Sequence, residues 1–156
     1  MAHLEWQNGF SVGLEVLDQQ HMRIIDYLNA LDDADVNDRA LIARILDETI
    51  DYTQTHFTYE ETLMEEASYP FLRAHTRVHE LFTHRVADYK RRFDAGEDVA
   101  RELHETLAHW LVRHIKREDA DYAKYLRAHF VKAAAASRPT PAPGLIARIR
   151  RFFADE

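Results

Sequence analysis

The chain has 156 residues, of which 27 are acidic and 20 basic, so its formal net charge is −7 at pH 7. This acidic balance argues against a nucleic-acid partner, and the absence of cysteine excludes disulfides, iron–sulfur clusters and thiolate zinc sites. The sequence contains neither a signal-peptide pattern nor the roughly 18 consecutive apolar residues of a transmembrane segment. We therefore expect one compact cytoplasmic domain, in which any metal is held by nitrogen and oxygen.

Apolar residues recur at spacings of three and four along four long segments, and only four glycines and four prolines interrupt the chain. The connections between these segments are short, so consecutive helices should be antiparallel neighbours. The predicted fold class is all-α, an up-down-up-down four-helix bundle within residues 1–136. The expected helices begin at Asp18 as an N-cap, near Asn37, at Pro70 and around Asp98, and the second and third end at about Glu66 and at Gly96.

Histidine and glutamate side chains fall on the inward-facing side of every predicted helix. Burying such a group without a partner costs several kcal/mol. One of them alone could be an ordinary hydrogen-bonded core residue, but a set with members on all four helices favours a shared cause, a metal site in the bundle interior. The residues are His21, His56, Glu60, His75, His79 and His114.

A further carboxylate, Asp119, follows His114 by five residues. On a regular α-helix this spacing turns the side chain by about 140°, so the two residues could not both face the core. A metal site that uses both requires the fourth helix to kink, bulge or pause within residues 115–118. The alternative is that Asp119 is one acid in the solvated run KREDAD.

These motifs together resemble the hemerythrin family, in its bacterial single-domain form, over residues 4–130. The resemblance implies two irons, one held by His75, His79 and His114 and the other by His21 and His56. The motifs are HFTYE at 56–60, HTRVH at 75–79 and HIKRED at 114–119, preceded by Trp6, Phe10, Val12, Gly13, Asp18 and His21.

The resemblance further implies that Glu60 and Asp119 bridge the two irons, together with a shared oxo or hydroxo group. It also implies a dry dioxygen pocket, with Leu111 over the open position. The residues expected to line this pocket are Phe57, Trp110, Leu111 and Ile115. For each of these four residues, plain core packing is the alternative.

The ligand set suggests what the irons do. Two octahedral irons have twelve coordination positions in total. The five histidines, the two bridging carboxylates and the shared oxo or hydroxo group fill eleven of them, so one position is open, on the iron held by His21 and His56. We expect reversible dioxygen binding, for storage, delivery or sensing, and no enzymatic activity. The alternative is scavenging or reduction of nitric oxide or peroxide at the same irons. Metal storage or a structural zinc site is disfavoured, since structural zinc sites are tetrahedral and closed.

The remaining five of the ten histidines lack ligand spacing and are expected at the surface or behind the ligands: His3, His84, His104, His109 and His129.

Residues 137–156 form a predicted extension. The segment SRPTPAP should be an extended linker, and GLIARIRRFFADE is a predicted amphipathic helix too short to be stable alone. Three interpretations of this helix stay open: it folds back onto the bundle, it docks a partner such as an oxygen-consuming protein or a second copy, or it contacts an anionic membrane. Its apolar arc comprises Leu145, Ile146, Ile149, Phe152 and Phe153.

Overall fold

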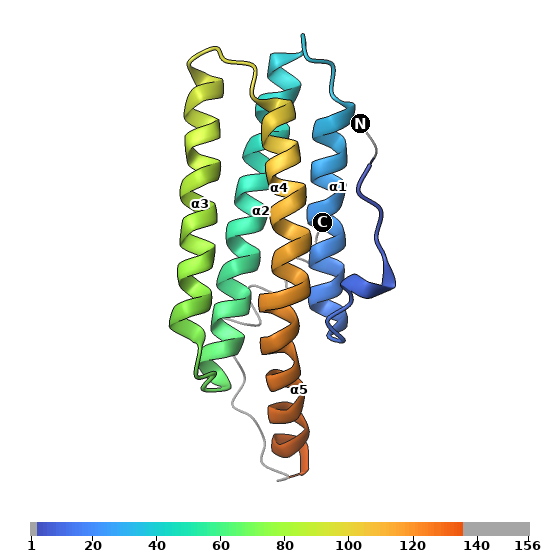
Figure 1. Cartoon of the computed structure of the whole chain (residues 1–156), viewed down its shortest axis with the longest axis vertical. Helices are drawn as coiled ribbons and strands as arrows, with labels where there is room; N and C mark the ends of the chain where they lie inside the picture. Colours follow the sequence, from blue (N-terminus) through green and yellow to red (C-terminus); the bar gives the residue numbers. More distant parts are fainter. Residues whose placement is uncertain (1–2, 136–156) are drawn as a thin grey trace.

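A computed structural model of the chain describes residues 3–135, and within them every regular element is a helix. The predicted all-α bundle is confirmed: the four long helices lie along one axis and alternate in direction (Figure 1). The predicted amphipathic helix and linker lie outside the described residues. The elements are η1 (Asn8–Phe10), α1 (Glu15–Asp33), α2 (Arg39–Glu66), α3 (Leu72–Asp94), α4 (Ala100–His114), η2 (Ile115–Asp119) and α5 (Ala120–Ala135).

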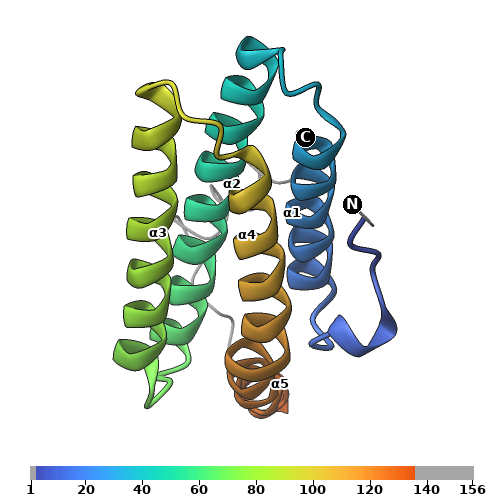
Figure 2. The ribbon, with the colours of Figure 1, turned by 45° about the horizontal axis from the view of Figure 1, so that its top comes forward.

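The four long helices surround a common interior, seen most clearly in Figure 2. Helix α1 packs against α2 and α4, and α2 packs against α3. Fully buried aliphatic side chains such as Leu28, Leu46 and Leu103 occupy the half of the interior near the α1–α2 connection. Each such side chain stabilises the fold by about 1.5–3 kcal/mol. This apolar half holds the helices in fixed register, so the other half of the interior can accommodate polar groups.

The first helix begins earlier than the sequence predicted. It starts at Glu15, and Asp18 lies in its first turn instead of capping it. The Asp18 carboxylate accepts hydrogen bonds from the Val12 N–H at 2.8 Å and from the Ser11 hydroxyl at 2.6 Å. The side chain therefore ties the preceding segment to α1.

The other helix ends lie close to their predicted positions. Asp38 caps α2 by accepting a hydrogen bond from the Leu41 N–H at 2.9 Å. Pro70 lies in the turn before α3 rather than in its first helical turn. Gly96, with a φ of +99°, follows the end of α3 as predicted, in a backbone conformation that other residues rarely adopt.

Candidate metal centre

All seven residues that the sequence singled out as metal ligands meet in the bundle interior. Their side chains come from the start of α1, the end of α2, the start of α3 and the end of α4 with η2, which the antiparallel arrangement brings to one level. They form two clusters of potential ligands that share Glu60 and Asp119. The seven, none more than 5% exposed, are His21, His56, Glu60, His75, His79, His114 and Asp119.

Glu60 lies between the two groups of histidines. Its Oε1 is 3.8 Å from His21 Nε2 and 3.4 Å from His56 Nε2. Its Oε2 is 3.9 Å from His75 Nε2 and 3.3 Å from His79 Nε2. Each oxygen of one carboxylate therefore faces a different group.

Asp119 repeats this arrangement. Its Oδ2 is 3.2 Å from His21 Nε2, whereas its Oδ1 is 3.4 Å from His75 Nε2 and 2.9 Å from His114 Nε2. The two carboxylates thus lie between a three-histidine group and a two-histidine group.

The element η2 explains how His114 and Asp119 both face the interior. Residues Ile115–Asp119 form one turn of π-helix, in which hydrogen bonds join residues five apart, so side chains five apart lie one above the other. The predicted interruption of the fourth helix is confirmed. Helix α5 then continues past η2 beyond the ends of the other helices (Figure 1).

Two residues that the sequence analysis missed orient ligand imidazoles. Gln20 Oε1 accepts a hydrogen bond from His56 Nδ1 at 2.7 Å, and Glu61 Oε1 accepts one from His79 Nδ1 at 2.8 Å. With the proton held on Nδ1, the Nε2 lone pair of each ring is directed into the cluster and is free to bind a metal.

A third missed residue is Tyr122, which is fully buried on α5. Its hydroxyl donates a hydrogen bond to Glu60 Oε1 at 2.5 Å. It follows Asp119 by three residues, so the spacing of one helical turn was a signal that the sequence offered. This bond fixes the orientation of the carboxylate between the two groups.

Several interior atoms of the cluster lack hydrogen-bond partners within the described part of the chain. They are His21 Nε2, Glu60 Oε2, His75 Nε2 and both carboxylate oxygens of Asp119. Buried polar atoms are almost always paired, so a cluster of atoms without protein partners is typical of a site that binds a ligand. Imidazole nitrogens and carboxylate oxygens are the donor set that iron accepts, and the residues present therefore fit a pair of irons.

Comparison with known proteins agrees with this geometry. The family model described as the hemerythrin HHE cation binding domain matches residues 12–126. The chain belongs to the hemerythrin family. This is a family of di-iron, oxygen-binding proteins.

Individual hemerythrins match over most of their length. The chain is 47% identical to the bacteriohemerythrin of Stenotrophomonas maltophilia (strain R551-3) over 155 residues, 98% of this chain and 99% of that protein. It is 35% identical to the bacteriohemerythrin of Methylococcus capsulatus, covering 82% of this chain and all of the relative. A crystal structure of a wild-type hemerythrin superposes with a TM-score of 0.76 at 34% identity, covering 80% of this chain and 98% of that chain.

The charges of this hemerythrin cluster balance one another. Burial lowers the pKa of His21 and His114, but the adjacent carboxylates, above all Asp119, outweigh it and raise these pKa values to about 9 and about 10. Burial lowers the pKa of His56 to about 4. Burial also opposes ionisation of Glu60 and Asp119, yet the surrounding histidines hold both pKa values below their usual range. Without metal, the cluster thus holds carboxylates and imidazolium groups together.

Aromatic rings cover one side of the three-histidine group. The ring of Phe57 stacks on His79 with centroids 3.8 Å apart, and that of Trp110 stacks on His114 at 4.3 Å. Phe82 stacks on Trp110 at 3.8 Å. We call Phe57, Phe82 and Trp110 the aromatic cluster.

These contacts bear on two of the four residues predicted to line a dioxygen pocket. Phe57 and Trp110 lie against ligand rings, as a pocket lining would, and Leu111 and Ile115 are buried where α4 meets η2. That these four residues line a dioxygen pocket stays a prediction.

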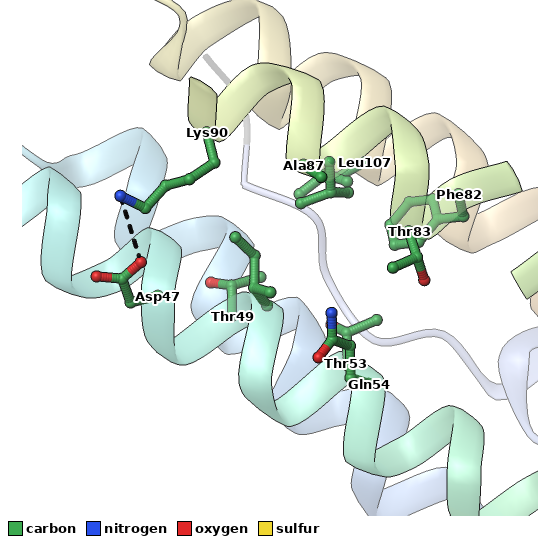
Figure 3. A pocket seen from close by; sticks show the side chains of 11 residues that line it. Asp47, Thr49, Thr53, Gln54, Phe82, Thr83, Ala87, Lys90 and Leu107 are labelled. Atoms are coloured by element: carbon green, nitrogen blue, oxygen red, sulfur yellow. Dashed lines mark ion pairs between the residues drawn. The ribbon is translucent and has the colours of Figure 1, made fainter. Parts of the chain in front are cut away.

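A cavity of about 290 Å³ lies between α2 and α3, with Phe82 of the aromatic cluster in its lining (Figure 3). Phe82 and Thr83 lie at one end, and Lys90 pairs with Asp47 at 3.5 Å at the other. None of the seven ligands lines this cavity. It is therefore separate from the metal centre, and Phe82 in its lining reaches the ligands through its contacts with the other two rings of the aromatic cluster.

One histidine contradicts the sequence prediction. His3, His84 and His109 are exposed and His129 is half-buried, but His104 is only 5% exposed. Its expected position at the surface or behind a ligand was wrong: α4 turns it inward, on the stripe that also contains Leu107 and Leu111, and among the described residues neither of its ring nitrogens has a hydrogen-bond partner. It belongs to neither cluster of potential ligands.

Among the described residues, no helix is both long and apolar enough to cross a membrane.

Proposed function

We propose that this hemerythrin binds dioxygen reversibly at two irons bridged by Glu60, Asp119 and a shared oxo or hydroxo group. The observation that carries the proposal is the position of the two carboxylates, each with one oxygen toward each group of histidines. A carboxylate that served one metal would direct both oxygens to the same group. Two irons side by side are the simplest occupants that use every buried donor.

The unequal histidine groups support a single open position. His75, His79 and His114 would complete one iron with the bridges, whereas His21 and His56 would leave the other one ligand short. When bound, the ferrous pair supplies the two electrons and the vacant position that dioxygen requires.

The protein residues supply the conditions for reversibility. Gln20 and Glu61 hold imidazoles in the metal-binding tautomer, and Tyr122 holds Glu60 in place. Buried residues, with Leu111 and Ile115 among them, exclude water and anions that would compete for the vacancy. Five neutral imidazoles with only two carboxylates favour returning dioxygen over activating it. We therefore propose a carrier for storage or delivery, and not an enzyme.

The test is a titration of the anaerobically iron-loaded chain with dioxygen, nitric oxide and hydrogen peroxide. The proposal predicts two irons per chain, uptake of one dioxygen per iron pair, and recovery of that dioxygen under argon. Catalytic consumption of nitric oxide or peroxide, with no recoverable dioxygen, would instead support the scavenging alternative. A matched His84→Gln control, at an exposed non-ligand position, should load and bind as the wild type does.

A further inference from the structure

A surface groove between α3 and α4 lies directly above one ligand of the metal centre. The two helices are in contact, and the groove has a volume of about 330 Å³. It contains no metal ligand and is separate from the cavity of Figure 3. We call it the arginine groove; its lining residues are Arg85, Glu105, Thr106, His109, Trp110 and Arg113.

Trp110 connects this groove to the centre. Its half-buried indole lines the groove and stacks on the imidazole of His114 with centroids 4.3 Å apart and ring planes 16° apart. His114 Nε2 in turn lies 2.9 Å from Asp119. The Trp110 ring therefore reaches from the protein surface to the ring of a ligand, His114, with which it is in van der Waals contact.

The groove also carries unbalanced positive charge. In the part of the chain that the structure describes, some exposed or half-buried arginines pair with a carboxylate, namely Arg77, Arg91, Arg92 and Arg101. Other described arginines, such as the exposed Arg44, Arg73 and Arg117, do not, but the groove brings two unpaired arginines and a histidine to the lining of one hollow. Within that part, no carboxylate lies within 4.0 Å of Arg85 or Arg113. The acid in the groove, Glu105, is paired with Arg101 at 3.3 Å. On a chain of net charge −7, two unpaired arginines beside an exposed histidine form a local positive patch.

We propose that the arginine groove docks an acidic one-electron donor protein, and that Trp110 and His114 conduct its electrons to the irons. This inference rests on the proposed function, because a dioxygen carrier that loses its two electrons becomes diferric and no longer binds dioxygen. Two reduced donors would each lose one electron, and the two ferric irons held by the centre would each gain one; an oxo bridge would take up one proton from water to become hydroxo. No covalent bond of this chain forms or breaks.

The chemistry of the groove favours an acidic protein as the occupant. Positive patches attract acidic partners over distances of about one Debye length and raise their association rates. Arg85 and Arg113 are both exposed in the groove, so their charges are accessible to an acidic protein surface. Its position over Trp110 places the redox group of such a partner near the ring that contacts His114.

The test compares reduction of the diferric chain by reduced flavodoxin, an acidic one-electron donor, with reduction by dithionite. The docking variant R85E/R113E reverses both groove arginines. The matched control R44E/R73E makes the same charge change at exposed positions elsewhere on α2 and α3. Stopped-flow absorbance gives the second-order rate constant at several salt concentrations.

We expect R85E/R113E to lower the flavodoxin rate constant by roughly tenfold or more at low salt, with the difference vanishing at high salt. R44E/R73E should change it by less than about twofold, and dithionite should reduce all three chains at similar rates. Equal flavodoxin rates for the two charge-reversed variants would overturn the inference. Trp110→Leu should lower the reduction rate measured at saturating flavodoxin, where a change in affinity has no effect, and an unchanged saturating rate would exclude the proposed route.

Docking is also measured without iron, so that it does not depend on the proposed function. In NMR spectra of the metal-free chain, oxidised flavodoxin should shift the indole N–H signal of Trp110 and leave that of Trp6 unchanged. A shift of neither signal, or of Trp6 alone, would refute docking at the groove. A chain that docks flavodoxin but binds no iron would contradict the proposed function and retain the groove as an interface.

Discussion

Loading of the metal centre should release protons, because two of its ligands are charged in the metal-free chain. His21 and His114 have pKa values raised to about 9 and about 10 by the carboxylates beside them, so at pH 7 both are almost fully protonated. An imidazole must lose its second proton before it can bind a metal. Each of these histidines therefore releases about one proton when iron enters.

The pKa values of the ligands indicate how many protons are released per iron pair. His56, with a pKa lowered to about 4, contributes no proton at pH 7, and the carboxylates are already ionised. His21 and His114 alone thus account for about two protons per iron pair. His79, whose pKa two adjacent carboxylates also raise against the effect of burial, and a hydroxide bridge formed from water would add to this number. The logarithm of the apparent iron affinity should therefore rise with pH with a slope of at least about two between pH 7 and 8.5.

The assay is anaerobic calorimetry of ferrous iron binding in buffers of different ionisation enthalpy, which gives the number of protons released. Histidines with the ordinary pKa of about 6.5 would release almost none above pH 7.5. A slope near zero in that range would refute the charge arrangement described above. The same raised pKa values stabilise the metal-free fold at low and neutral pH, and this stabilisation should disappear as the pH rises through about 9 and about 10.

Three substitutions test other contacts. Tyr122→Phe removes a buried hydrogen bond to Glu60 and should lower the free energy of unfolding of the metal-free chain by about 1–3 kcal/mol in urea titrations; an unchanged midpoint would count against the bond. Glu61→Gln replaces the carboxylate that accepts from His79, and should weaken iron binding by about 10–100-fold in competition with a chelator, without loss of helix content by circular dichroism. Gly96→Ala places a side chain at a φ of +99° and should cost about 1 kcal/mol of stability, although no neighbouring atom blocks the added methyl group.

The sequence predicted the ligands because metal-binding residue types appeared where the helical period demands core residues. His21 lies on the same stripe as Ile24 and Leu28, so its burial followed from spacing alone. The π-turn was predictable for a stereochemical reason: His114 and Asp119 could share a site only if the helix widened between them. In both cases the geometry of the helix left few alternative positions for the side chain.

Other features depended on side-chain contacts that spacing does not determine. Gln20 and Glu61 each precede or follow a ligand by one residue, and nothing in the sequence distinguishes them from solvated polar residues. Asp18 has the residue type of an N-cap, but it lies within the first turn of α1 and its carboxylate bonds to the preceding segment. The burial of His104 was a different kind of miss, since Leu107 and Leu111 on the same stripe already indicated it.

The most direct measurement of the central claim is repeated cycling of the iron-loaded chain between air and argon, with the visible spectrum recorded at each step. A reversible dioxygen carrier predicts an absorption band of the oxygenated form that appears in air and disappears under argon over many cycles, at two irons per chain. A band that fails to form, or that decays within one cycle to a stable diferric spectrum, would contradict reversible dioxygen binding.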